Sequence, residues 1–519
     1  MPLRVEIPMS GPPTRRVLLD QVHSVICNRI KDGEEQYLVR WKTDSLPQKP
    51  PLSWHNINEL ARCLEHVQDY LDARTKSPRE VSALSNLSKK RKSPDSDLDV
   101  TRRPSPFEHR LNIASRTPST ERSQSRSNTP SVINDRSSSL GVYNGVLDSE
   151  DGFVYARSSS EPSVAVIDLR DVPTPEMQQT ARRSKTDRAH IMIRAEYDRR
   201  LKKVPGKPIH LVNTFDSTTP SLRFRYIKDY ELQEGVYKLD PTTQEGCQKC
   251  SPHMGRDIGC EYTKKCDCLE YAAVDESRLT TSKLQQEYRE SRESGGSSIG
   301  LPKKFPYFAE GTKIQRVGTL VPFYLHSRRP IYECNGNCKC GPYCRNKNVQ
   351  FGRTVELEIF KTASGRGWGL RCKQDLAEGQ FVDTYRGEVI TDAEATRREE
   401  SSSKAKASYL YSLDKFQESE GLDDSEIYVV DGEFMGGPTK FMNHSCEPNC
   451  RQYTVSYNKH DCRVYDIAFF ACRDIPAGEE LTFDYLDKEE GDDDEVQEVS
   501  PDAIPCLCGT AKCRRWLWT

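Results

Sequence analysis

Apolar and polar residues follow a regular pattern near the start of the chain. The segments "HSVICNRI", "KDGEE" and "YLVRWK" predict a strand, a polar turn and a second strand. After a proline-rich loop, "SWHNINELARCLEHVQDYLDA" begins extended and then places Leu60, Leu64, Val67 and Leu71 at helical spacing. We therefore predict a small folded module over residues 15–75.

The pattern is lost from residue 76 to residue 190, where Ser, Thr, Pro and Arg dominate. Such a segment buries too little apolar surface to offset its ordering entropy, which predicts a disordered linker. Its "KKRKSP" stretch suits a nuclear import signal, a nucleic-acid contact or simply solvated chain, and Ser93 before Pro94 suits phosphorylation. Helical and extended patterns return over residues 191–235, in "RAEYDRRL" and "IHLVNTFDSTTPSLRFRYI".

Composition supports this division. The chain has 519 residues, whereas single hydrophobic cores stop growing at roughly 250–300 residues, so several domains are expected. Only 35% of the residues are hydrophobic and 30% are charged, which favours long disordered segments. The sequence has no run of about 20 apolar residues and no apolar signal core at its start, which predicts a cytosolic or nuclear protein. Because thiols stay reduced in those compartments, clusters among the 19 cysteines indicate metal ligands rather than disulfides.

Nine cysteines form two groups within residues 236–350. The groups are Cys247, Cys250, Cys260, Cys266 and Cys268, followed by Cys334, Cys338, Cys340 and Cys344. Nine thiolates around three zinc ions must fill twelve coordination positions, so three sulfurs would be shared between ions. Spacing alone leaves iron–sulfur ligation open, as well as independent buried cysteines or a redox pair. The polar stretch "SKLQQEYRESRESGGSSIG" between the groups is expected to be a surface insertion.

A third cysteine group lies at the end of the chain, within residues 505–519. Cys506, Cys508 and Cys513 supply three ligands, one fewer than a closed tetrahedral zinc site needs. The fourth ligand must come from another part of the chain.

Five further motifs complete the pattern: "GRGWGL", "YRGEVI", "YLYSLD", "NHSCEPNC" and "GEELTFDY". In this order, with the flanking cysteines, they resemble the SET-domain lysine methyltransferases. The resemblance is to the heterochromatin type that methylates lysine 9 of histone H3, as in the fission-yeast enzyme with its N-terminal chromodomain. It implies a mainly β fold of short strands with a knot-like C-terminal crossing, a pre-SET cluster of three zinc ions, a SET domain over residues 351–486 and a post-SET tail holding one zinc.

The resemblance also assigns the site. It makes Cys446 the fourth ligand of the tail zinc and leaves Cys450 as a packing residue. It implies that S-adenosylmethionine is bound by residues of three motifs and the tail, namely Arg366, Gly367, Trp368, Tyr409, Asn443, His444 and Trp516. A dinucleotide-binding loop is not expected, because Leu370 stands where G-x-G-x-x-G requires its third glycine. "NHS" fits a glycosylation site, which a cytosolic or nuclear location argues against.

Methyl transfer to lysine sets demands that these motifs can meet. The amine must be neutral although free lysine has a pKa near 10.4, and an apolar channel close to a sulfonium lowers that pKa. By resemblance, Tyr485 aligns the amine and Tyr409 lines the channel. At Phe483 a tyrosine hydroxyl would hold a water that crowds the amine, so phenylalanine predicts di- and trimethylation.

Partners are expected in chromatin. The segment "VVDGEFMGGPTKFMNHS" is predicted to receive the histone H3 tail as an added strand. The acidic loop over residues 487–504 either attracts that basic tail or is simply solvated, within a chain whose net charge is −2. "EEQYLVRWK" and Trp54 resemble a chromodomain, whose methyl-lysine cage would here contain Trp41 but also Asp20 and Asp44, so a module with a degraded cage is favoured.

The resulting hypothesis is a nuclear H3 lysine-9 methyltransferase of heterochromatin that acts in gene silencing with unidentified complex partners. Two alternatives stay open: a catalytically silent chromatin reader or scaffold, and a methyltransferase for another histone or non-histone lysine.

Overall fold

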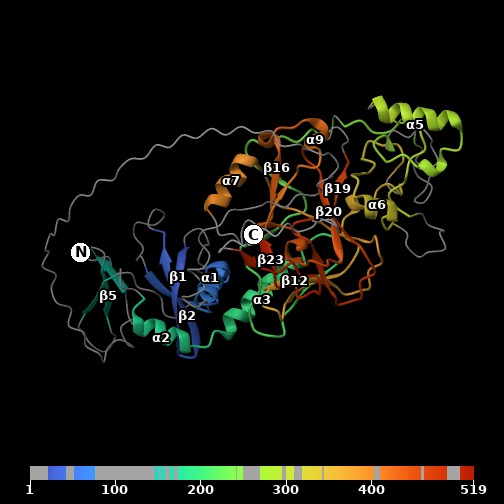
Figure 1. Cartoon of the computed structure of the whole chain (residues 1–519). Helices are drawn as coiled ribbons and strands as arrows, with labels where there is room; N and C mark the ends of the chain where they lie inside the picture. Colours follow the sequence, from blue (N-terminus) through green and yellow to red (C-terminus); the bar gives the residue numbers. More distant parts are fainter. Residues whose placement is uncertain are drawn as a thin grey trace, which may run out of the picture. The chain divides into compact units, whose positions relative to one another are not determined.

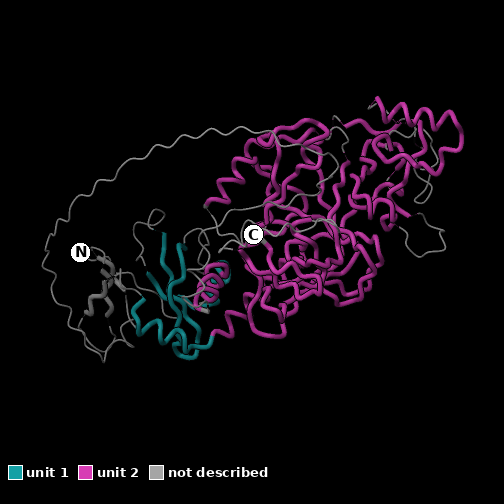
Figure 2. The backbone as a smooth tube through the Cα atoms, in the orientation of Figure 1, with its two compact units in different colours: residues 1–63, 97–185 teal, residues 64–96, 186–519 magenta. Residues whose placement is uncertain are grey.

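The computed structural model describes most of the chain outside its N-terminal and linker segments. The described residues are 22–42, 52–75, 147–150, 153–157, 164–168, 173–240, 242, 244–248, 250, 269–294, 298, 300–308, 318–341, 344–401, 409–457, 461–487 and 503–518. They belong to two compact units (Figure 2). Unit 1 comprises residues 1–63 and 97–185, and unit 2 comprises residues 64–96 and 186–519.

Unit 1 contains the predicted N-terminal hairpin. Strands β1 (Val22–Lys31), β2 (Glu34–Trp41) and β3 (Leu52–Asn56) form an antiparallel sheet in that order (Figure 1). The β1–β2 turn contains Asp32 and Gly33, both at positive φ (53° and 79°), a conformation that glycine and aspartate tolerate better than other residues. The predicted strand, hairpin and strand are therefore confirmed.

Unit 1 also contains a helix that the sequence analysis assigned to the linker. Helix α2 (Pro175–Arg183) begins at Thr174, whose side chain accepts a hydrogen bond from the Met177 amide at 3.3 Å. The helix lies against β1, where the Cys27 thiol donates to the Met177 carbonyl at 3.6 Å. Three short strands precede it, namely β4 (Leu147–Glu150), β5 (Phe153–Arg157) and β6 (Val164–Asp168). The prediction of a continuous disordered linker to residue 190 is therefore corrected. The segment contains a short, capped, amphipathic helix, whose two buried residues are too few to change its polar average composition.

Unit 2 contains six α-helices in the part of the chain that is described. They are α1 (Leu64–Thr75), α3 (Asp187–Leu201), α5 (Ser282–Ser294), α6 (Pro322–Ser327), α7 (Asp392–Ser401) and α9 (Gln417–Glu420). Helix α5 buries none of its residues, in agreement with the surface insertion expected there. Helix α1 follows the N-terminal hairpin in the chain, yet it packs on α3 and belongs to unit 2.

Several small sheets make up the rest of unit 2 (Figure 1). A five-stranded sheet has the order β18 (Asn443–His444), β21 (Glu480–Phe483), β12 (Trp368–Cys372), β11 (Leu357–Lys361) and β7 (Ile209–Val212). A four-stranded sheet has the order β10 (Ile331–Tyr332), β19 (Cys450–Ser456), β20 (Asp466–Ala471) and β13 (Phe381–Tyr385). A second four-stranded sheet has the order β15 (Leu410–Ser412), β16 (Tyr428–Asp431), β14 (Glu388–Thr391) and β9 (Glu231–Leu232).

Unit 2 also contains two pairs of very short strands. Strand β8 (Arg225–Tyr226) runs parallel to β17 (Met435–Gly436), and β22 (Ile504–Pro505) runs antiparallel to β23 (Trp516–Trp518). Four 3₁₀ turns complete the described elements, η7 (Glu276–Arg278), η8 (Val349–Phe351), η9 (Asp424–Glu426) and η10 (Pro438–Phe441). The mainly β class is confirmed, and the knot-like crossing stays a prediction.

The core of unit 2 is rich in aromatic residues. All six residues of β20 are buried, and Phe470 packs edge-on against Tyr453 of β19, with ring centroids 5.5 Å apart. The Tyr453 hydroxyl donates to the Leu325 carbonyl at 2.7 Å, so the cysteine-rich segment and the sheet share one core. Among the described helices, none is both long enough and apolar enough to cross a bilayer.

Candidate active site

Three of the motifs that are far apart in the sequence lie on adjacent strands. Strand β18 runs parallel to β21, with Asn443 opposite Thr482 and His444 opposite Phe483. Strand β12, which carries "WGL", runs antiparallel to β21 on its other side. The sheet therefore brings the "GRGWGL", "NHSC" and "ELTFDY" segments together.

Tyr485 follows the end of β21 and is held at both its backbone and its ring. Its hydroxyl donates to the Met442 carbonyl at 2.9 Å, and its amide donates to Nδ1 of His444 at 3.1 Å. Burial, with the nearby Tyr409 and Glu480, raises the pKa of the Tyr485 phenol well above its usual value. The hydroxyl therefore stays protonated at neutral pH and can orient another group but cannot act as a base.

An aromatic wall surrounds Tyr485. The Phe483 ring is 1% exposed and lies 4.8 Å from the centroids of both Phe469 and Tyr485, while Tyr411 stacks on it at 6.5 Å. Such a wall excludes water from whatever lies against it. The structure thus brings together the two predicted residues Phe483 and Tyr485.

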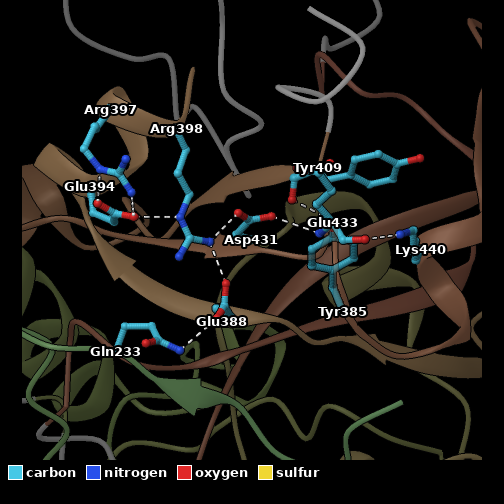
Figure 3. Close-up of polar contacts among 10 residues, drawn as sticks. All are labelled: Gln233, Tyr385, Glu388, Glu394, Arg397, Arg398, Tyr409, Asp431, Glu433 and Lys440. Carbon is cyan, nitrogen blue, oxygen red and sulfur yellow. Dashed lines mark hydrogen bonds and ion pairs between the residues drawn. The ribbon is translucent and has the colours of Figure 1, made fainter. Parts of the chain in front are cut away.

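Tyr409 is positioned through its backbone. Its carbonyl accepts hydrogen bonds from the Tyr385 hydroxyl at 2.8 Å and from the Gly432 amide at 3.1 Å. Figure 3 shows Tyr409 and Tyr385 side by side next to Glu433 and Lys440. The Lys440 ammonium lies 4.7 Å from the centroid of the Tyr409 ring, a cation–π distance.

The turn beside Tyr409 is held by an ion-pair network (Figure 3). Arg398 of α7 contacts Glu388 at 2.6 Å and Asp431 at 2.7 Å, and Asp431 accepts a hydrogen bond from the Glu433 amide at 2.9 Å. Asp431 is only 4% exposed, so its charge needs these partners. No sequence motif predicts this network, because its members lie in separate segments of the chain.

A polar cluster lies where β12 and β18 meet β21. The Asn443 side chain donates to the Trp368 carbonyl at 3.1 Å and to Glu480 at 2.8 Å, and Arg366 pairs with the same carboxylate at 2.5 Å. Gly367 has φ at 76°, which a side chain would strain. Three of the predicted cofactor residues, Arg366, Trp368 and Asn443, therefore lie together, and Glu480, which the sequence analysis missed, joins them.

The tail cysteines meet Cys446 beside this cluster. The sulfurs of Cys446, Cys506, Cys508 and Cys513 all lie within 4.8 Å of one another, with Cys446 and Cys506 3.8 Å apart. Sulfurs about 2.3 Å from a tetrahedral zinc lie about 3.8 Å apart, so the four residues fit such an ion. Trp516 follows in β23, paired with β22.

The tail also contacts the catalytic strand directly. Arg514 donates to both carboxylate oxygens of Asp484, at 2.9 and 2.5 Å, in the fork geometry that makes arginine–carboxylate pairs strong. His444 lies between the two regions, with Nε2 3.2 Å from the Cys446 sulfur and Nδ1 accepting from Tyr485. His444 was predicted to hold the cofactor, and its contacts here include Tyr485, Cys446 and Asp484.

The other cysteine groups are described in part. Cys334, Cys340 and Cys344 bring their sulfurs within 4.8 Å of one another, and Cys247 and Cys250 are 3.4 Å apart. The predicted ligands Cys260, Cys266 and Cys268 lie outside the described residues. Cys450 is fully buried in β19, in agreement with a packing role.

Comparison with known protein families assigns the class to which this arrangement belongs, the SET-domain proteins. The SET domain model matches residues 367–486 and the Pre-SET motif model matches residues 201–347. The Pre-SET match thus begins earlier than the boundary expected at residue 236.

Relatives give the same answer. A Neurospora crassa protein named "Histone-lysine N-methyltransferase, H3 lysine-9 specific dim-5" is 38% identical over 60% of this chain and 88% of its own length. A Fusarium mangiferae protein, named as an H3 lysine-9 specific enzyme KMT1, has the same identity and coverage, 38%, 60% and 88%. An H3 lysine-9 specific enzyme of Schizosaccharomyces pombe is 35% identical over 62% of this chain and 57% of its own. The chain belongs to the SET-domain histone-lysine N-methyltransferases.

Proposed function

We propose that this enzyme transfers methyl groups from S-adenosylmethionine to lysine 9 of histone H3. The observation that carries the proposal is Tyr485, a buried phenol that is fixed by Met442 and His444 at the end of an aromatic wall. The choice of lysine 9 is supported by the names of relatives that share 35–38% identity with this chain.

The chemistry follows from the environment of Tyr485. A lysine amine must lose its proton before it can attack the methyl group, and an apolar channel disfavours the ammonium form. Because the raised pKa keeps the Tyr485 phenol protonated, we do not assign this residue the role of the base that takes the amine proton. Tyr485, Tyr409 and Phe483 then act by alignment, holding the amine in line with the methyl group and excluding water.

Arg366, Gly367, Trp368, Asn443 and His444 would hold the cofactor, with Tyr409 and Trp516 completing its site. The fit rests on the polar cluster, where an arginine, an amide, a carboxylate and a backbone carbonyl gather beside the aromatic wall. A zwitterionic sulfonium needs both donors and acceptors, and this cluster has both. When bound, S-adenosylmethionine supplies the activated methyl group.

Phe483 supports di- and trimethylation. Its ring packs between Phe469 and Tyr485 and brings no hydroxyl to the channel. In a Phe483→Tyr variant the added hydroxyl would bind a water near the amine, so mass spectrometry should show accumulation of monomethylated product. Phe469→Tyr, at the neighbouring ring, is the matched control for an added hydroxyl. An unchanged product distribution in Phe483→Tyr would contradict this role.

Zinc is the metal that the cysteine sites favour. We assign one ion to Cys446, Cys506, Cys508 and Cys513, and three ions to the nine upstream cysteines. Thiolate ligands in a reduced compartment are typical of structural zinc, which contributes directly to folding. Elemental analysis of the purified protein should find four zinc ions per chain.

The proposed location is the nucleus, on heterochromatin, with the H3 tail as substrate. The N-terminal sheet supports a chromodomain-like module, in which Trp41 is 7% exposed and donates to the Ser53 hydroxyl at 2.7 Å. A buried, hydrogen-bonded indole is a poor wall for a methyl-lysine cage. The other two cage positions, Asp20 and Asp44, lie outside the described residues, and we favour protein interaction over methyl-lysine binding.

The substrate is tested with labelled S-adenosylmethionine and a series of H3 peptides in which each candidate lysine is replaced in turn by arginine. Label should be lost only when lysine 9 is replaced. Tyr485→Phe keeps the ring and removes the hydroxyl bonded to Met442, so it should lose activity while keeping its fold. Labelling that persists without lysine 9 would overturn the substrate assignment, and a lack of labelling on every peptide would favour a catalytically silent chromatin protein.

A further inference from the structure

Helix α1 contacts the rest of unit 2 through a buried polar side chain, Gln68. Gln68 is 3% exposed, and its amide donates to the Thr219 carbonyl, the Thr219 hydroxyl and the Pro220 carbonyl at 3.0–3.1 Å. Its own carbonyl oxygen accepts from the Leu222 amide at 2.7 Å. One glutamine therefore satisfies the backbone of a whole turn, which would otherwise need other partners in a buried place.

Charged contacts surround this glutamine. Glu65 of α1 pairs with Arg200 of α3, and Arg200 also donates to the Leu222 carbonyl. Asp69 pairs with Arg223 at 2.6 Å near the surface. Helix α1 thus determines where residues 219–223 lie, together with α3.

The turn leads directly into the wall of the active site. Phe224 follows it and is 4% exposed, with its ring 6.0 Å from that of Phe441. The Lys440 ammonium lies 4.2 Å from the Phe224 centroid and 4.7 Å from the Tyr409 centroid, so one cation joins two aromatic rings. Burial lowers the pKa of Lys440 to about 8, partly offset by Glu433 and Asp431, which leaves the amine mainly charged at neutral pH.

The backbone follows the same route. The Arg225 amide donates to the Phe434 carbonyl at 2.8 Å and the Ile227 amide to the Gly436 carbonyl at 3.1 Å, which joins β8 to β17. Strand β17 continues into η10 and then to Met442, whose carbonyl accepts the Tyr485 hydroxyl. The segment that Gln68 holds is therefore linked to both tyrosines of the channel. Phe224 reaches Tyr409 through Lys440, and the β8–β17 pairing leads along the chain to Met442 and Tyr485.

We propose that helix α1 contributes to catalysis by positioning the channel wall. Gln68 and Lys440 are the positioning residues, and they hold Tyr409 and the Met442 carbonyl in place. The inference rests on lysine methylation but not on the identity of the lysine. It means that the helix that follows the N-terminal hairpin in the chain supports catalysis by holding the channel wall of unit 2.

The test uses the full chain with Gln68→Met and Lys440→Met, which keep side-chain length and remove the polar contacts. Each variant is assayed for kcat, for KM toward an H3 peptide and toward S-adenosylmethionine, and for the distribution of methylated products. We expect kcat to fall by about threefold to tenfold in both variants, with less change in KM for the cofactor. Lys440→Arg keeps the cation between the rings and should restore most of the loss. Ala73→Gln, at an exposed position of α1, is the matched control and should behave as the native protein.

A second measurement does not depend on turnover. Hydrogen exchange of residues 409–412 and 438–442 should speed up in Gln68→Met although the substitution is in α1. Asp69→Asn weakens only the exposed contact with Arg223 and should give the same change in exchange rate at smaller size. It covers the case in which Gln68→Met fails to fold.

The proposal is overturned if folded Gln68→Met or Asp69→Asn shows native exchange in both segments, or if Gln68→Met melts earlier yet keeps native kcat and products. Inactivity of the native protein on H3 peptides would instead refute the proposed function, while the exchange measurement would still decide the role of α1.

Discussion

The upstream and the tail cysteine sites use the same ligand chemistry in opposite surroundings. The described upstream cysteines are buried and form one hydrophobic cluster with Leu269, Ala272 and Phe305. The four residues of the tail site are only partly buried, and their neighbours are His444 and Arg514, which contact the catalytic strand. The upstream site is part of a hydrophobic core, whereas the tail site lies against residues next to Tyr485.

The size of each segment explains the difference. The tail has 16 described residues, 503–518, with one two-stranded pairing, β22 with β23, and such a segment buries too little surface to be stable alone. An ion held by four thiolates can supply the missing folding energy. Because Cys446 of this cysteine cluster contacts His444 and Arg514 pairs with Asp484, we expect folding of the tail and order around Tyr485 to depend on each other.

Replacing one cysteine in each site should give the largest difference between a role in catalysis, expected for the tail site, and a role in folding, expected for the upstream site. Cys508→Ser should lower kcat/KM by more than about 100-fold, since the loss of a ligand exceeds the cost of losing one of its supporting partners. Its thermal unfolding should stay close to native, whereas Cys344→Ser should lower the yield of folded protein and its Tm. Equal losses of Tm in both variants, measured by calorimetry, would remove the distinction.

Stepwise chelation should show the same order in the unmodified protein. The partly exposed tail site should lose its ion first, with loss of methyl transfer and of about one ion per chain. Unfolding should begin only when the buried upstream ions leave. Zinc release, activity and circular dichroism are followed together, and simultaneous loss of all three signals would speak against two independent sites.

Arg514→Met tests the contact between tail and catalytic strand without touching a ligand. Removing the guanidinium leaves the Asp484 carboxylate, 10% exposed, without its bidentate partner, so the strand should shift. We expect an activity loss of about tenfold to 100-fold with native zinc content. Lys512→Met removes one exposed charge from the same tail and should have little effect, while a native rate in Arg514→Met would show that the tail acts only through its ion.

Cys450→Ala gives the smallest effect and defines the baseline for a cysteine that is not a ligand. It lies in β19 with no exposed surface, so its loss should cost about 1 kcal/mol of unfolding free energy. Metal content and KM should be native. Loss of an ion from this variant would place Cys450 among the ligands after all.

Local patterns explain which parts were predictable. The strand and hairpin before residue 42 and the helix with Leu64, Val67 and Leu71 follow from periodicity, which depends only on neighbouring residues. Leu60, which was predicted to lie on the same helical face, lies in a turn before the helix begins. Tyr485 and Phe483 were found because they lie in a motif. Glu480 was missed although it lies in the same motif, since its partners Arg366 and Asn443 come from two other strands.

The linker prediction was wrong where it relied on average composition instead of on a local pattern. A nine-residue helix, α2, stands in a polar stretch whose average resembles disorder, and only Met177 and Ala181 provide its buried face. Helix α1 was expected as part of the N-terminal module, and its buried Gln68 shows that its contacts include residues about 150 positions further along the chain.

By itself, the sequence indicated the cysteine groups through the spacing of their thiols, while the candidate channel residues Tyr485, Tyr409 and Phe483 came from motifs that resemble a known family. Tertiary structure decided which of these groups touch: His444 with Tyr485, Arg514 with Asp484, and Gln68 with the turn before Phe224. Each of those contacts joins segments that no periodicity relates, since a hydrogen bond or ion pair depends on distance in space and not on separation along the chain.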